Sequence, residues 1–452
     1  MSISHAQQAL TPEVLKQLSS QGEATPAERA LRNAIQSGSI NKLSAVPNNP
    51  KATDTWFAVE VKNSGITNQE SSGRCWLFTG TNVLRQRAMK NLGIENFMFS
   101  HVYTFFYDQL EKSNLFLQGI IDTRKQSIDS QQVQWLMQNP LSDGGTYTGV
   151  ADLVTKYGLV PKDVMPETTI ANSTSEFNGH LKRKLREIAI NLREKSEAGA
   201  SAKQLEAYKV QEMKTVYRML TMAYGEPVKE FTWAPKDKNG KQMREPKQYT
   251  PLSFYKEVCA PEEDLNADYV MLMNDPSRPY NKVYEIDMDR HMYDGHNWLY
   301  VNLDIDELSS IAIASLWDNV PMYFSCDVGK QLDRQTGFLS LDNFEYGNLF
   351  GTTFGMNKRQ RIQTRDSGSS HAMTLMAVDL DEKGKPTKWK VENSWGEKNG
   401  YQGHMIMTDE WFREYMFRVV VNRKYCPQSV LDLLKQKPTR LPAWDPMFME
   451  EE

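Results

Sequence analysis

Residues 68–76, which read NQESSGRCW, are the sharpest local feature of this sequence. Apolar residues after Cys75 recur at helical spacing, so a helix is predicted to begin at Cys75, and small residues on one face predict close packing. A cysteine acts as a nucleophile only as the thiolate, and an ordinary cysteine, with a pKa of about 8.5, is mostly protonated at neutral pH. A helix N-terminus favours the thiolate. We therefore expect Cys75 to be a nucleophile.

The loop before Cys75 also holds a predicted donor for a developing negative charge. Gln69 lies six residues before Cys75, and its side-chain N–H is expected to stabilise an oxyanion together with the backbone N–H of Cys75. Gly73 would let a substrate approach the backbone closely. Taken alone, Cys75 is interpreted equally well as a buried, inert thiol.

Two later motifs supply the partners that a nucleophilic cysteine needs. His371 opens an apolar strand in SSHAMT, and Asn393 lies in VENSWG. A histidine base needs a third group to fix its tautomer and orientation, and an asparagine oxygen can accept the ring N–H. Trp395 is expected to shield that bond from water. Each motif alone is compatible with a structural histidine or a simple turn, but the order Cys, His, Asn makes coincidence a poor explanation.

Composition restricts the classes of protein. The chain has 452 residues, 40% of them apolar and 24% charged, and a net charge of −4, which argues against a dedicated nucleic-acid binder. No signal peptide is visible, and the apolar stretches fall short of the roughly 20 residues that a membrane helix needs. Four widely spaced cysteines, without a CxxC pair, suit a reducing compartment. A cytoplasmic location is the expectation.

Patterning predicts an α+β arrangement. A leading helix is expected within residues 1–54, with further helices near 100–112, 127–138 and 147–157. Long charged helices are expected over 176–224, followed by a hairpin with Asn239–Gly240 at its tip. Strands are expected from about residue 320, in the segments PMYFSCDV, HAMTLMAVDL, KWKVENSW, GHMIMTD and RVVVNR.

The three motifs resemble the signature boxes of papain-like cysteine peptidases, and His371 precedes Asn393 by a fitting 22 residues. The 296 residues between Cys75 and His371 are about twice the ~130–150 expected of papain and cathepsins. Ser72 stands where secreted relatives carry a disulfide cysteine. Both departures fit one subfamily, because the chain resembles the bleomycin hydrolase and aminopeptidase C group. The matching stretches are NQESSGRCWLF, DGGTYTGVADLVTKYGLVPKDVMPET, CDVGK, ENSWGEKNGYQGHMIMTDEWFREY and LPAWDPM.

The resemblance implies a papain-like core, made of a helical part and an antiparallel, β-barrel-like part, with a large helical insertion and a C-terminal arm. Its expected parts are an N-terminal assembly segment (1–54), a helical half with Cys75 (55–170), an inserted helical and hairpin segment (171–290), a strand-rich half with His371 and Asn393 (291–426) and the arm (427–452). The family's arm enters its own active-site cleft, where the terminal carboxylate meets the free α-amine of a peptide. The family assembles as a hexamer, so a homohexamer acting on peptides with a free N-terminus is expected, with no cofactor, no metal and no membrane or nucleic-acid partner.

Two alternatives remain open. The tail, Phe448-Met449-Glu450-Glu451-Glu452, departs from the small apolar residues that are common in the family, so it either strengthens amine capture or stays in solvent. In the second case the same triad would give an oligo-endopeptidase. The alternative from another class is a non-catalytic channel or nucleic-acid-binding scaffold.

Other residues are assigned structural roles. A metal site at His291, Asp294 and His296 is set aside because its spacing matches no common ligand motif. His101 is expected to be a helical core histidine. The sequence Asp143-Gly144-Gly145 is expected to border the substrate cleft without taking part in catalysis. The remaining thiols, expected to be buried or structural, are Cys259, Cys326 and Cys426.

Overall fold

The structure, a computed structural model, describes residues 9–19, 24–47, 49–52, 54–62, 65–259 and 264–448. The chain divides into two compact units. Unit 1 comprises Met1–Asn49 and Asp342–Gly355, and unit 2 comprises Pro50–Leu341 and Met356–Glu452. Each unit is described by itself.

Unit 1 is built from short helices. They are α1 (Pro12–Ser19), α2 (Pro26–Ser37), α3 (Ile40–Ser44) and α12 (Tyr346–Phe350). Helix α2 begins with a capping box, in which Thr25 and Glu28 each accept the other's backbone N–H. A bridge between Ala45 and Phe344 joins the two stretches of chain. Neither α1 nor α2 buries a residue.

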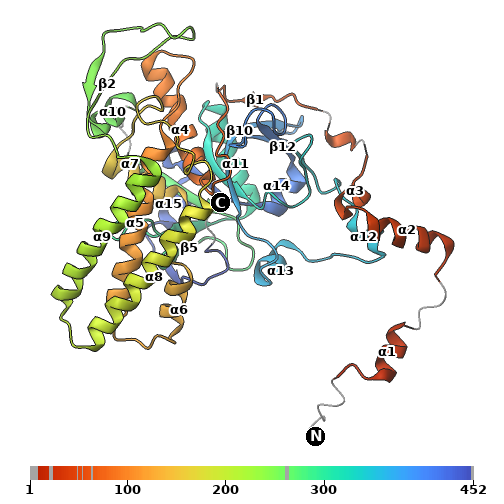
Figure 1. Cartoon of the computed structure of the whole chain (residues 1–452). Helices are drawn as coiled ribbons and strands as arrows, with labels where there is room; N and C mark the ends of the chain where they lie inside the picture. The colour runs from red at the N-terminus through yellow and green to blue at the C-terminus, as the bar shows by residue number, and fades with distance from the viewer. Residues whose placement is uncertain are drawn as a thin grey trace. The chain divides into compact units, whose positions relative to one another are not determined.

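The first half of unit 2 is mainly helical (Figure 1). Helices α5, α8 and α9 pack side by side, and a two-stranded hairpin of β2 and β3 follows them. The elements of this half are η2 (Pro50–Ala52), β1 (Val59–Glu60), α4 (Cys75–Leu92), α5 (His101–Asp122), α6 (Gln131–Gln138), α7 (Tyr147–Tyr157), α8 (Ser175–Glu197), α9 (Ala202–Tyr224), β2 (Phe231–Trp233), β3 (Lys247–Tyr249) and α10 (Pro251–Val258).

The second half of unit 2 contains most of a large mixed sheet, with the strand order β14-β5-β6-β4-β13-β7-β10-β11-β12-β9-β8 and β1 paired to β10. Its elements are β4 (Tyr269–Met273), β5 (Lys282–Ile286), β6 (Leu299–Asn302), α11 (Ile305–Trp317), β7 (Met322–Cys326), β8 (Leu332–Asp333), β9 (Phe338–Leu339), α13 (Lys358–Gln363), β10 (His371–Leu380), β11 (Pro386–Glu392), β12 (His404–Thr408), α14 (Asp409–Tyr415), β13 (Met416–Asn422), η3 (Arg423–Tyr425), α15 (Gln428–Leu433) and β14 (Thr439–Leu441).

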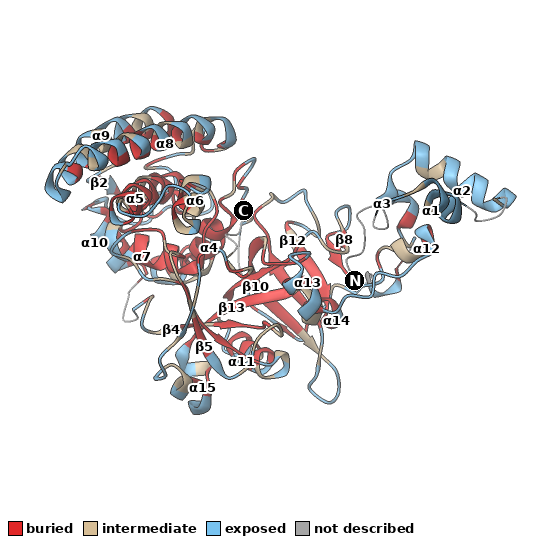
Figure 2. Ribbon diagram, turned by 90° about the horizontal axis from the view of Figure 1, so that it is seen from below, coloured by how far each residue is buried: buried red, intermediate tan, exposed pale blue. Residues whose placement is uncertain are grey.

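The two faces of the central strands bury different cores, as the alternation of side chains along a strand requires. Ala372 of β10 and Val420 of β13 join the core of the helical half, which includes α4. Their neighbours Met373 and Val419 pack instead with residues of α11. Strand β13 is buried throughout and β10 is buried except for its last two residues, whereas α8 and α9 expose their outer sides (Figure 2). Helix α4 is therefore held directly against the sheet.

The α+β class and the expected elements are confirmed. A helix begins at Cys75, the charged stretch forms α8 and α9, and every strand expected after residue 320 is present. Gly240, at the tip of the expected hairpin, has a φ of 79°, in the region that favours glycine. Strands β4, β5 and β6 are not predicted by the sequence pattern, and they extend the sheet beyond β13. Among the described residues, no helix combines the length and apolarity needed to cross a membrane.

Candidate active site

Cys75 is the first residue of α4, and its side chain is fully buried. Its Sγ accepts the backbone N–H of Ala372 at 3.3 Å, so the thiol lies beside the first residues of β10. Gly80 explains how closely α4 packs, because a Cβ on Gly80 would lie 2.7 Å from the methyl groups of Val150 on α7. The expected helix start and the expected small-residue contact are both confirmed.

His371 and Asn393 meet across neighbouring strands. The Nε2–H of His371 donates to Oδ1 of Asn393 at 2.8 Å, and the two residues are only 1% and 2% exposed. The backbone N–H of Ser394 also donates to Asn393 Oδ1 at 2.8 Å, which turns the amide oxygen toward the ring. The rings of Trp395 and His371 lie 4.8 Å apart. Since Nε2 is occupied by Asn393, Nδ1 is the ring nitrogen that remains for the thiol.

Hydrogen bonds tie the Gln69 side chain to two loops of the site. Its Nε2 donates to the carbonyl of Ser72 at 2.6 Å, and its Oε1 accepts the hydroxyl of Ser394 at 2.6 Å. The backbone N–H of Gln69 donates to the carbonyl of Ser394 at 2.8 Å. The loop before the nucleophile is thereby joined to the loop after Asn393. The structure thus gathers Gln69, Cys75, His371 and Asn393 at one place, as the sequence predicts.

Two buried arginines near Cys75 are not predicted by the sequence as part of the site. Arg74, at the N-cap of α4, pairs with Glu167 at 2.7 Å and donates to the Ser72 hydroxyl at 2.8 Å. Arg85, on the same helix, pairs with Glu392 at 2.7 Å, and Glu392 directly precedes Asn393. A charged residue on a helix that must pack closely signals a buried partner. The partner of each arginine is too distant in the sequence to be identified from a local pattern.

The residues around Asp143 form a wall of the site. The Asp143 carboxylate accepts the backbone N–H of Gly73 at 3.3 Å, and its carbonyl accepts the indole N–H of Trp76 at 2.7 Å. Lys112 donates to the carbonyls of Ser142, at 3.1 Å, and of Gly144. The wall is therefore tied to the loop that carries Cys75.

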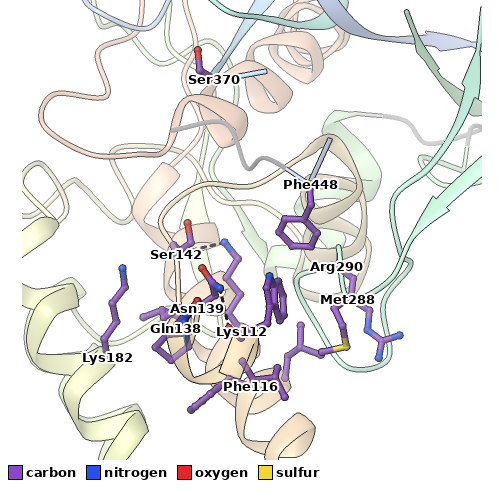
Figure 3. A pocket seen from close by; sticks show the side chains of 15 residues that line it. Lys112, Phe116, Gln138, Asn139, Ser142, Lys182, Met288, Arg290, Ser370 and Phe448 are labelled. Carbon is purple, nitrogen blue, oxygen red and sulfur yellow. Dashed lines mark hydrogen bonds between the residues drawn. The ribbon is translucent and has the colours of Figure 1, made fainter. Parts of the chain in front are cut away.

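Next to this wall lies a cavity of about 460 Å³ (Figure 3). Ser142 of the wall and Ser370, the residue before His371, both line it. Phe448, the last described residue, lies there too, and its ring is 5.3 Å from that of Trp135. The end of the described chain thus reaches the surroundings of His371. The predicted contact of the acidic tail with substrate concerns residues 449–452, which lie outside the described residues.

The histidines set aside as metal ligands have other partners. His291 Nε2 accepts the backbone N–H of Thr146 at 3.2 Å, and Nδ1 lies 2.5 Å from Asp108 Oδ1, so Nδ1 carries the donated proton. His296 pairs with Asp152 at 2.7 Å. His101 is buried and stacked on Phe78 with ring centroids 3.6 Å apart, which confirms the predicted core histidine. Among the described residues, no three potential metal ligands gather.

All four cysteines are described; none of them forms a disulfide, and all are buried. Burial raises the pKa of Cys259 and of Cys426 to about 12, which makes both poor nucleophiles at neutral pH. The surroundings of Cys75 differ chemically from those of Cys259 and Cys426. The site combines a thiol at a helix N-terminus, an imidazole with an oriented ring and amide donors in one buried place, the set required for acyl transfer through a thioester.

Comparisons with known proteins agree with this geometry. The model of the Peptidase C1-like family matches residues 9–448. Bleomycin hydrolase of Homo sapiens is 41% identical over 398 residues, which cover 86% of this chain and 87% of that protein. Aminopeptidase C of Lactobacillus delbrueckii subsp. lactis is 35% identical over 427 residues, covering 93% and 94%. The crystal structure of PepW from Lactobacillus rhamnosis HN001 superposes with a TM-score of 0.93 at 36% identity, covering 98% of this chain and 100% of the other.

Proposed function

This chain belongs to the Peptidase C1-like family and is a papain-type cysteine peptidase, and from that premise we propose that it releases N-terminal residues from peptides, with Cys75 as the nucleophile. The observation that carries the proposal is the buried 2.8 Å hydrogen bond from His371 to Asn393 beside the Cys75 thiol. Ala372, the residue after His371, contacts the Cys75 sulfur, which brings the thiol to the neighbourhood of the oriented imidazole. The proposal applies to peptides with a free N-terminus and assigns the chain to the cytoplasm.

The proposed reaction proceeds through two acyl transfers. His371 Nδ1 takes the Cys75 proton as Sγ attacks the first peptide carbonyl, and the proton then passes to the leaving amine. Water hydrolyses the resulting thioester and restores the thiol. Asn393 keeps the ring in place and stabilises its charged form, while Gln69 and the Cys75 backbone N–H donate to the oxyanion. Burial of the triad strengthens each of these electrostatic contacts.

The restriction to N-terminal residues is proposed to come from the C-terminal arm. Phe448 lines the same cavity as Ser370, the residue that precedes His371. A carboxylate placed there would pair with a substrate α-amine and exclude a longer chain. The competing function is an oligo-endopeptidase, which is expected if the arm leaves the cleft open. Cleavage of an N-acetylated peptide at the rate of its free counterpart would favour that alternative.

Assembly into a homohexamer is also part of the proposal. Helices α1 and α2 bury no residue, yet unit 1 carries exposed large apolar side chains at Leu15, Leu18 and Leu31. Exposed apolar side chains can contribute to an interaction site when they form a patch, and the partner proposed here is another copy of the chain. Light scattering at micromolar concentration tests the assembly, and a purely monomeric mass would contradict it.

Alanine substitution tests the roles of the residues. Cys75→Ala is expected to abolish peptide cleavage with circular dichroism and thermal unfolding unchanged, because only the sulfur is removed. His371→Ala should lower kcat at least about a hundredfold, as expected for loss of a general base. Cys426→Ala is the matched control, because it removes a buried thiol from another part of unit 2 and should retain activity. Cleavage by the Cys75→Ala protein would refute the assignment of Cys75 as the nucleophile.

A further inference from the structure

The segment after β14 is held to the body of unit 2 by two arginines. We infer that Arg278 and Arg418 are positioning residues that clamp this C-terminal arm and so determine how strictly the enzyme requires a free N-terminus. The inference rests on the proposed function, in which the arm caps the cleft. It adds the residues that hold the arm in position.

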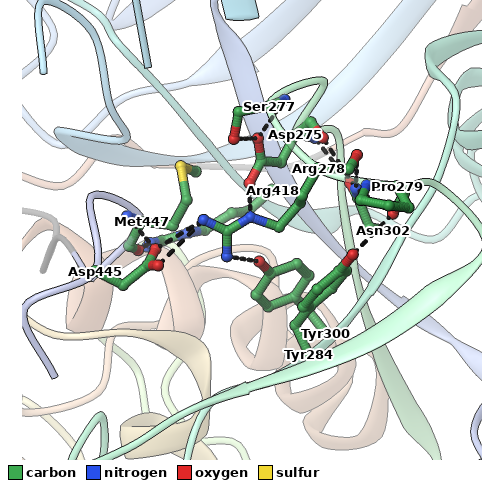
Figure 4. A network of polar contacts seen from close by, with 10 residues as sticks. All are labelled: Asp275, Ser277, Arg278, Pro279, Tyr284, Tyr300, Asn302, Arg418, Asp445 and Met447. Carbon is green, nitrogen blue, oxygen red and sulfur yellow. Dashed lines mark hydrogen bonds and ion pairs between the residues drawn. The ribbon is translucent and has the colours of Figure 1, made fainter. Parts of the chain in front are cut away.

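Arg278 holds the arm through Asp445. Its Nη2 lies 3.1 Å from both carboxylate oxygens of Asp445, and its Nε lies 2.9 Å from the fully buried Asp275 (Figure 4). The guanidinium also stacks 5.4 Å over the ring of Tyr284. Asp445 is 9% exposed, so water competes weakly with this pair. One arginine thereby joins the arm to a carboxylate of the sheet half.

Arg418 holds the arm two residues further on, through its backbone. This side chain of β13 is fully buried, its guanidinium lies 4.3 Å over Trp298, and its Nη2 donates to the carbonyl of Met447 at 2.7 Å. The N–H of Met447 donates to Asp445 Oδ1 at 2.9 Å. Both polar backbone groups of Met447 are therefore bound, and its side chain is 1% exposed. The arm is fixed at this residue in position and direction.

A fixed Met447 limits the reach of the last residues of the chain. Phe448 comes directly after the clamp and lies in the cavity shared with Ser370. Four more residues come after Phe448, and four residues span at most about 14 Å. With so short a tether, the position of Met447 restricts the space that the terminal carboxylate can reach, and loss of the clamp removes that restriction. An unclamped arm would admit peptides without a free amine and would capture free amines less well.

The test removes the contact on the arm and leaves the arginines in place. Asp445→Ala breaks the pair with Arg278, while Asp275 still compensates that arginine, so the protein is expected to fold. The rate on an N-acetylated peptide, relative to the same free peptide, should rise at least about tenfold, as expected for loss of a charge-assisted hydrogen-bonded pair. The KM for the free peptide should rise while kcat changes little. Asp445→Asn keeps the size and should give a smaller effect.

The matched control is Arg440→Met, which removes an ion pair to Glu285 from an arginine of β14 that is 64% exposed. It should leave the ratio of acetylated to free cleavage unchanged. A chain ending at Met447 serves as the reference for complete loss of the cap. If that truncation opens the enzyme to acetylated peptides and Asp445→Ala does not, the clamp is refuted and the proposed function stands. If the truncation itself changes nothing, the capping function fails.

Discussion

Replacing Glu392 with glutamine removes one charge from a buried pair that joins the helix of Cys75 to the strand before Asn393. Glu392 Oε1 lies 2.7 Å from Arg85 Nη2, and both side chains are 1% exposed. Arg85 Nη2 also donates to the carbonyl of Gly65 at 3.0 Å, whereas its Nε and Nη1 have no hydrogen-bond partner among the described residues. In the variant the guanidinium stays buried with its charge uncompensated.

The expected cost is about 3–5 kcal/mol, the usual result of removing one partner of a buried pair. Native proteins are stable by only about 5–15 kcal/mol, so the unfolding midpoint should fall clearly. The assay is urea unfolding monitored by circular dichroism and by peptide cleavage. Glu187→Gln is the control, because it breaks the exposed pair with Lys184 on α8 and should cost less than about 1 kcal/mol.

A double replacement separates the burial of a charge from the loss of a contact. Arg85→Met combined with Glu392→Met leaves no charge behind and should recover most of the stability that Glu392→Gln loses. The folded molecules of each variant should still cleave peptide, because neither residue contacts the substrate in the proposed reaction. A loss below about 1 kcal/mol for Glu392→Gln would refute the buried pairing.

Three further predictions concern the triad, a buried lysine and the other thiols. Asn393→Ala should lower kcat about 10- to 100-fold with little change in KM, because the lost bond stabilises a charged ring; steady-state kinetics checks this, and an unchanged kcat would contradict it. Burial lowers the pKa of Lys358 to about 7, so above that pH the unfolded chain binds the extra proton and stability rises with pH by up to about 1.4 kcal/mol per unit. Lys358→Met should lose this dependence in urea unfolding at pH 6, 8 and 9.5, and equal slopes would refute it. Iodoacetamide at pH 7.5 should modify Cys75 and spare Cys259 and Cys426, whose pKa values burial raises; mass spectrometry that found either of those first would argue against the assignment.

The sequence predicts those parts of the site that depend on local pattern. A run of helical spacing after Cys75 and an apolar strand after His371 are visible within a dozen residues, and the order of the motifs supplies the grouping. Pairing then brings the parts together, since Thr374 of β10 lies opposite Glu392 of β11. That register carries Asn393 to the ring of His371.

The contacts that the sequence does not predict depend on partners far apart in the chain. Arg85 and Glu392 are 307 residues apart, and Arg278 and Asp445 are 167 apart. Strand β4 pairs with β13, which comes much later in the sequence. The local sequence of a short apolar strand beside a helical insertion does not indicate which strand it will pair with. Such contacts arise from packing of the whole chain rather than from any window of it.

Cys75 is proposed to remove residues from the free N-terminus of a peptide. The most direct measurement is mass spectrometry of the products formed from one peptide, with a free and with an acetylated N-terminus, by the wild-type and Cys75→Ala proteins. The wild type is expected to shorten the free peptide stepwise from its N-terminus and to leave the acetylated peptide intact, and Cys75→Ala is expected to cleave neither. Internal fragments from the acetylated peptide, or stepwise shortening by Cys75→Ala, would contradict it.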